Sequence, residues 1–114
     1  MAITRSMHAT LTLDGNPQAI SSAAAIGEKR LRGLSLTHDP ANTHAFVIGG
    51  TNATLTASDY GDRMPAPSSS GETAPTPPWV RDGFKDGTKR TSDYVVLGFS
   101  GEKVHILADV YVDP

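Results

Sequence analysis

The chain has 114 residues, a formal net charge of -2 and no cysteine. This length is typical of one domain, and the absence of cysteine excludes a disulfide framework and thiol chemistry. The slightly negative charge argues against nucleic-acid binding, which normally requires a basic face. No apolar run is long enough to cross a bilayer, and the first residues lack the apolar core of a signal peptide. We therefore expect a protein made and kept in a cytoplasm-like compartment, with no membrane partner.

The first segment predicts a strand over residues 3–13. Apolar and polar residues alternate along it, and only Arg5 interrupts the apolar set. This period of two is typical of a strand with one buried face. A turn follows at residues 14–17, then a short return strand at residues 17–20. Residues 21–27 are open to two interpretations, a single helical turn or a loop of small residues.

The middle of the chain predicts three more short strands separated by turns. The strands are expected at residues 31–37, with Leu34 and Leu36 inward, at residues 45–48, ended by Gly49 and Gly50, and at residues 53–57. Residues 38–43 contain an Asp-Pro and an Asn, which favour a turn. Residues 60–62 predict a further turn.

Residues 64–80 form a proline-rich segment of a different kind. Its five prolines exclude a central strand, because proline donates no hydrogen bond to a sheet, and they favour extended chain. Two interpretations remain open. The segment is either a disordered surface loop beside a buried Trp79, or an arm that lies across a neighbouring subunit.

The last segment, residues 94–112, predicts a long antiparallel hairpin. Residues 94–99 are an apolar run, Ser100 and Gly101 favour a tight turn, and apolar residues then alternate from Val104 to Val112. With the strands above, this pattern predicts one all-β domain over residues 1–114. We expect an antiparallel β-sandwich or small jelly roll with one long proline-rich loop. Residues 1–13 would be an N-terminal strand or arm.

Catalytic and metal-binding patterns are weak throughout the sequence. His38, Asp39 and His44 are close in sequence, but a metal site needs three or four converging ligands, and a structural turn is favoured. The carboxylates lie in or beside turns, no serine lies in a Gly-X-Ser-X-Gly motif, and no His-X-His pair is present. We therefore expect neither enzymatic activity nor a cofactor.

Residues 31–112 resemble small virion proteins of tailed bacteriophages. The resemblance is carried by the order of elements: a strand, the Asp-Pro-Ala-Asn-Thr turn at residues 39–43, a strand ending at Gly49-Gly50, the stretch at residues 60–67, and the closing segment from Ser100. Such proteins occur as capsid decoration (cement) proteins and near the neck or tail. The resemblance brings no catalytic residues with it.

The resemblance implies a decoration protein that binds the major capsid protein on the outside of the phage head and stabilises it. We expect a homotrimer, because three weak contacts joined in one body bind more tightly than each contact alone. Two alternatives remain, a neck or tail module, or a carbohydrate-binding module using Tyr60, Trp79, Tyr94 or Tyr111. The residues expected to bind a partner are those of the two candidate arms and their apolar neighbours: Ile3, Arg5, Met64, Pro65, Pro67, Pro77, Pro78, Trp79 and Phe84.

Overall fold

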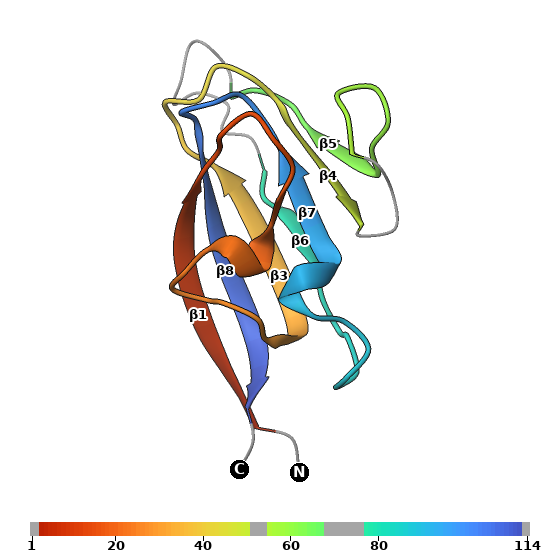
Figure 1. Cartoon of the computed structure of the whole chain (residues 1–114). Helices are drawn as coiled ribbons and strands as arrows, with labels where there is room; N and C mark the ends of the chain where they lie inside the picture. Colours follow the sequence, from red (N-terminus) through yellow and green to blue (C-terminus); the bar gives the residue numbers. More distant parts are fainter. Residues whose placement is uncertain (1–2, 51–54, 68–76, 113–114) are drawn as a thin grey trace.

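A computed structural model describes residues 3–50, 55–67 and 77–112 of the chain. These residues form two four-stranded antiparallel sheets that face each other (Figure 1). The first sheet has the strand order β1-β8-β3-β6 and the second has the order β2-β7-β4-β5. The strands are β1 (Ile3–Thr12), β2 (Gln18–Ala19), β3 (Arg30–His38), β4 (Phe46–Gly50), β5 (Asp62–Met64), β6 (Trp79–Arg81), β7 (Tyr94–Leu97) and β8 (Lys103–Val112). The expected all-β sandwich is therefore confirmed.

The strand pairing is that of a jelly roll. The first strand pairs with the last, β2 with β7, β3 with β6, and β4 with β5, all antiparallel. This is the pattern of one long hairpin rolled up, so that β8 also lies beside β3, and β7 beside β4. Eight strands in two such sheets are the usual form of this fold.

The predicted closing hairpin is wrong, because its two strands lie in different sheets. β7 belongs to the second sheet and β8 to the first. Between them the chain turns at Gly101, whose φ of 92° is a conformation that glycine adopts readily. The turn was thus correctly placed, but the pairing was not. Both strands carry the β-branched composition of a buried strand, and composition does not say which neighbour a strand takes.

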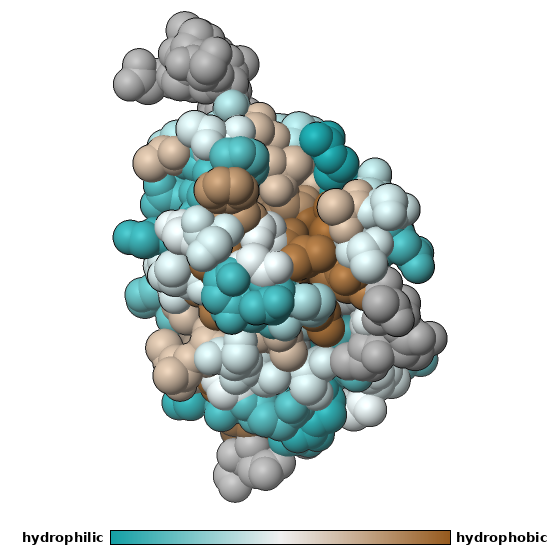
Figure 2. All heavy atoms as spheres, turned by 45° about the horizontal axis from the view of Figure 1, so that its top comes forward, coloured by the Kyte–Doolittle hydropathy of each residue, from teal (hydrophilic) through white to brown (hydrophobic). Residues whose placement is uncertain are grey.

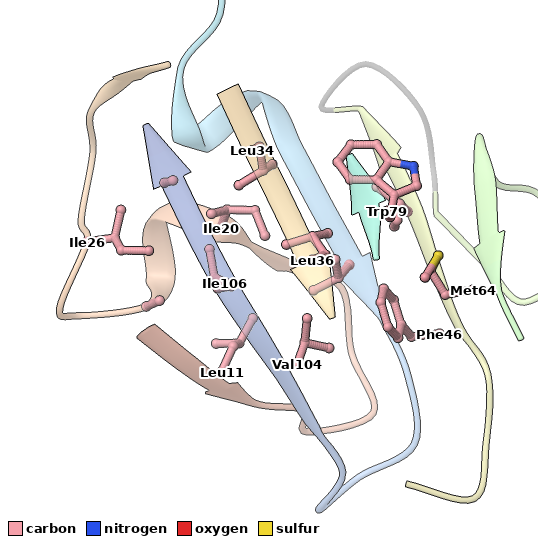
Figure 3. Packing of buried hydrophobic residues seen from close by; sticks show 14 of the residues in the cluster. Leu11, Ile20, Ile26, Leu34, Leu36, Phe46, Met64, Trp79, Val104 and Ile106 are labelled. Carbon is pink, nitrogen blue, oxygen red and sulfur yellow. The ribbon is translucent and has the colours of Figure 1, made fainter. Parts of the chain in front are cut away.

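The core lies between the two sheets and agrees with the predicted alternation along β1 and β8. Leu11 is 6% exposed, and the inward residues Val104, Ile106, Ala108 and Val110 of β8 are 0–2% exposed. Figure 3 shows Leu11, Val104 and Ile106 beside Leu36 of β3 and Phe46 of β4, so the core draws on both sheets. Burial of one such side chain stabilises the fold by about 1.5–3 kcal/mol.

The inward residues of β3 depend on an irregularity in the strand. Leu34 and Leu36 are 2% and 0% exposed, as predicted, and Leu31 is also 0% exposed although its parity differs. The register of β3 against β8 shifts between Leu31 and Gly33, so one extra residue is accommodated there. The bulge lets both sets of leucines face the core.

The second sheet differs from the prediction at both ends of β4. Gly49 and Gly50 belong to β4 and pair with Val95 and Tyr94 of β7, so the strand continues two residues beyond Ile48 and ends at Gly50. A side chain at Gly49 would meet Leu55, so the glycine leaves room for Leu55 on the outer face of the sheet. Part of the strand expected at residues 53–57 lies outside the described residues, and residues 55–57 are not in a strand. The turn expected at residues 60–62 ends one residue early, since Asp62 begins β5.

Of residues 21–27, the first two belong to a short 3₁₀ turn, Ile20–Ser22, whose Ile20 is buried, and residues 23–27 are in neither a helix nor a strand. A second such turn, Thr91–Asp93, precedes β7. No helix within the described residues is long and apolar enough to cross a membrane.

Candidate functional site

Five of the residues predicted to bind a partner lie together where β5 ends and β6 begins. They line a shallow cleft of about 500 Å³, which we call the proline cleft. Its lining residues are Met64, Pro65, Pro77, Pro78, Trp79, Val80 and Arg81. β5 and β6 are edge strands of different sheets, so the proline cleft opens at one side of the sandwich. The strand pairing thus brings together residues from both ends of the proline-rich segment.

Trp79 forms the floor of the proline cleft rather than its exposed surface. Its side chain is 7% exposed, and its indole Nε1 donates a hydrogen bond to Oδ2 of Asp62 at 2.9 Å. The guanidinium carbon of Arg81 lies 4.6 Å from the centre of the indole ring, and Arg81 also forms an ion pair with Asp62. Asp62 therefore ties the edge of one sheet to the edge of the other.

Exposed proline rings surround this buried floor. Pro65, Pro77 and Pro78 are exposed, whereas Met64 is 7% exposed and packs in the core (Figure 3). The structure thus matches the interpretation that Trp79 is tucked into the core. Residues 68–76, the centre of the expected arm, lie outside the described residues. Pro67, beside them, is half-buried.

Ile3, Arg5 and Phe84 do not line the proline cleft. Ile3 and Arg5 lie at the start of β1, near the two ends of the chain (Figure 1). Phe84 is half-buried and stacks on Tyr94, with ring centres 6.1 Å apart. The predicted residues therefore belong to separate places on the molecule and do not form one surface.

A larger cleft, which the sequence did not indicate, lies on the outer face of the second sheet. We call it the apolar cleft; its volume is about 710 Å³. Its floor includes Val47 and Leu97, which are directly opposite each other on β4 and β7, with Ala57 and Phe99 also lining it. Arg63 of β5 is the cationic residue of the lining. Figure 2, in which the top of Figure 1 comes forward, shows brown, hydrophobic side chains gathered near the middle of the face in view.

Phe99 is the most exposed aromatic side chain of the apolar cleft, at 55%. Its ring stacks on His44 with ring centres 3.9 Å apart and an angle of 2° between the planes. The sequence placed Phe99 in a hairpin strand, so its position beside His44 was missed. The signal was present in its neighbour, because a glycine-containing turn starts immediately after Phe99 and such turns end strands.

The His38, Asp39 and His44 segment is a structural turn, as expected. Oδ1 of Asp39 accepts the backbone N–H of Ala41 at 2.9 Å, which is the usual turn role of aspartate. Oδ2 of the same carboxylate lies 2.9 Å from Nε2 of His105. These hydrogen bonds hold the pKa of Asp39 below its ordinary value, the Ala41 contact contributing most. Among the described residues, no three histidine or carboxylate side chains gather as metal ligands.

Glu102 holds the other end of this turn. Its carboxylate accepts the backbone N–H groups of Thr43 and His44 at 2.9 and 3.1 Å, and it also contacts their side chains. Burial alone would raise the pKa of Glu102, but these hydrogen bonds outweigh it and lower the pKa to about 2. The polar groups at this end are thus satisfied by one another.

Comparison with known proteins gives no relative. No family model, no curated protein and no solved structure matches the chain.

Proposed function

We propose that this protein is a non-enzymatic structural protein that docks onto a larger protein assembly. The observation that carries the proposal is the proline cleft, where Pro65, Pro77 and Pro78 stand exposed around a fixed tryptophan. Proline has little conformational freedom to lose on binding, so an apolar surface made of it is inexpensive to order. The indole beneath is already immobilised by Asp62, which adds to this rigidity.

The assembly that we propose is the head of a tailed phage. The protein would bind the major capsid protein on the outer surface and act as a decoration protein, as the resemblance of residues 31–112 implies. Several copies joined together would multiply weak contacts into stable attachment. Jelly rolls occur in viral capsid and lectin domains, which is compatible with this role, although a fold alone does not establish a function. A neck or tail module is the alternative position on the same particle.

The test measures attachment to assembled heads. Purified protein is mixed with heads lacking it and sedimented, and the double variant Pro77→Ser, Pro78→Ser is compared with Pro17→Ser. Pro17 is exposed in the turn after β1, away from the proline cleft, so it is the matched control. We expect the double variant to sediment less with the heads, with unchanged circular dichroism, and the control to behave as wild type. Equal sedimentation of all three proteins would contradict the role of the proline cleft.

The copy number separates the two positions on the particle. A decoration protein is present in many copies on each head, whereas a ring module at the neck or tail is expected in about six or twelve. Quantitative mass spectrometry of purified virions gives this number directly. Absence from the virion would contradict both positions.

A second candidate is carbohydrate binding at the apolar cleft. It rests on the exposed ring of Phe99, backed by His44, beside Arg63. None of the four aromatic residues expected for this role lines the apolar cleft: Trp79 packs edge-on against Tyr94, and the Tyr111 hydroxyl donates to the backbone carbonyl of Phe84. A glycan array with Phe99→Ala as the variant tests it, and binding that is unchanged by the substitution would contradict it.

A further inference from the structure

The two sheets present four edge strands, and one of them differs greatly from the others. β2 has two residues and β5 and β6 have three each, whereas β1 has ten. Proteins commonly protect sheet edges by keeping edge strands short, or by placing proline or a bulge in them. β1 contains no proline, and its pairing with β8 is continuous from Ile3 to Thr12. It is therefore a long, regular edge.

The hydrogen bonds at the C-terminal end of β1 show which of its backbone groups point away from its own sheet. Leu13 donates its N–H to Glu102 and accepts from Gly101, so the groups of Leu13 point toward the β8 side. Successive residues of a strand alternate, and the groups of Thr4, Ser6, His8, Thr10 and Thr12 therefore point outward. The side chain of Gln18 confirms this direction, since it donates to the carbonyl of Thr12 at 3.2 Å.

Within the described part of the chain, Gln18 is the only residue that bonds to this outward edge. Two polar side chains of β1 turn back to their own sheet: Ser6 donates to Asp109 at 2.5 Å, and Thr10 lies 2.9 Å from His105. Their hydroxyl groups are thus engaged by β8 and do not satisfy the edge. The outward backbone groups of residues 4–10 remain available to another strand.

We propose that β1 pairs antiparallel with β1 of a second copy of this chain, around a twofold axis at Met7. The carbonyl of Thr12 limits the register, because it already accepts a hydrogen bond from the Gln18 side chain. A ladder centred on Met7 uses the outward backbone groups of residues 4–10 and does not disturb that bond. Thr4 would face Thr10 of the second copy, and Ser6 would face His8, each pair exchanging backbone hydrogen bonds.

The side chains of β1 fit this register on the inner face of the sheet. Ile3, which is 46% exposed, would lie opposite Leu11 of the second copy. Arg5, the only formally charged side chain of β1 at neutral pH, would lie opposite Ala9, so the two arginines avoid each other. In this register odd-numbered residues of one copy lie opposite odd-numbered residues of the other. The apolar face of one sheet therefore continues into the apolar face of the other.

The product is one continuous sheet of eight strands with two cores on the same side. The inference does not depend on the proposed function, but it bears on the oligomer, since a strand that pairs with itself joins two copies and not the three expected from the sequence. A pair still presents two proline clefts to a larger assembly.

The first test is the mass in solution. Sedimentation equilibrium of the wild-type protein is expected to give twice the chain mass of 12.0 kDa. His8→Pro removes an outward N–H, which an edge strand tolerates without losing its own ladder, and is expected to give the monomer. His8→Ala keeps the N–H and is the matched control, expected to remain a dimer. A wild-type monomer, a trimer, or a folded His8→Pro dimer would overturn the proposal.

The second test does not depend on the stability of the proline variant. Two Met7 residues facing across the axis form a non-hydrogen-bonded pair, whose Cα atoms lie about 4.5 Å apart, within disulfide range. The chain has no cysteine, so Met7→Cys gives one defined thiol. We expect mild oxidation to link Met7→Cys into a covalent dimer and to leave Thr10→Cys, which would face Thr4, largely unlinked. Equal linking of the two variants, or none in either, would overturn the register.

Discussion

The side-chain amide nitrogen of Asn42 lies 2.9 Å from Nδ1 of His38, and both residues are buried. Oδ1 of Asn42 accepts the backbone N–H of Lys103 at 3.0 Å, which fixes the orientation of the amide. Its NH₂ group therefore donates to His38 and to the carbonyl of Lys103. Nδ1 of His38 is then an acceptor, and Nε2 carries the proton toward the carbonyl of Met64 at 3.2 Å. This network joins β3, β8 and the end of β5 through a neutral imidazole.

The first prediction concerns the pH dependence of stability. Burial lowers the pKa of His38 from its ordinary value, although the Met64 carbonyl favours the charged form. The folded protein thus binds fewer protons at this site than the unfolded chain, whose histidine titrates near about 6.5. We expect the free energy of unfolding to fall as the pH drops below that value.

Urea denaturation at neutral and mildly acidic pH measures this effect, with His38→Gln as the comparison. The variant lacks the titrating group, so its stability should depend less on pH in this window, whatever its absolute stability. Identical pH dependence in the two proteins would show that His38 does not titrate in this way.

The second prediction concerns Glu102. The folded pKa of about 2 is below the ordinary 4.5, so the carboxylate contributes stability above pH 4.5, and this contribution is lost as the pH falls from 4.5 toward 2. Glu102→Gln should lower the free energy of unfolding at neutral pH by about 2 kcal/mol, since the hydrogen bonds that Thr43 and His44 donate to a charged acceptor are lost. It should also flatten the acid limb of the stability curve.

Asp59→Asn is the control for Glu102→Gln. Asp59 is exposed, and its carboxylate forms no hydrogen bond or ion pair with the described residues. The substitution should therefore leave the free energy of unfolding almost unchanged. Thermal unfolding of both variants across the acidic range provides the comparison. A loss in Asp59→Asn as large as that in Glu102→Gln would indicate a general charge effect.

The third prediction tests the inward parity of β8. Ile106 is 2% exposed and Leu107, its neighbour, is 50% exposed. Ile106→Asp would place an unpaired charge in the core and should abolish folding, at a cost of more than about 4 kcal/mol. Leu107→Asp, the matched control, should fold normally. Circular dichroism and solubility decide the outcome, and a native-like Ile106→Asp protein would contradict the assigned parity.

The sequence predicted the strands better than their partners. The alternation from Ile3 to Leu13 and from Val104 to Val112 is a local pattern of side chains, and burial in the structure follows it from Met7 to Leu13 and from Val104 to Val110. The pairing of β7 with β2 and β4, instead of β8, depends on contacts between distant segments, which a local pattern does not contain. Likewise, Gly49 was interpreted as a strand end because the packing of Leu55 above it was not visible in the sequence.

The candidate sites likewise divide into one that local sequence composition indicated and one that depends on contacts between distant segments. The prolines and Trp79 stand out by composition, and the structure brings Pro65, Pro77 and Pro78 to one cleft. The apolar cleft was missed because Val47, Leu97 and Phe99 are ordinary strand and turn residues in sequence. Only the pairing of β4 with β7 and the position of the turn after β7 place them together.

Because β1 pairs with β8 along its entire length, two strands that are far apart in the sequence depend on each other. During synthesis, β1 emerges from the ribosome long before its partner and stays unpaired until β8 has been translated. The nascent chain therefore completes its first sheet only after β8 has been made, and pairing across such a long loop is slow. A cell that makes this protein has to keep the apolar side chains of β1 from other chains during that interval.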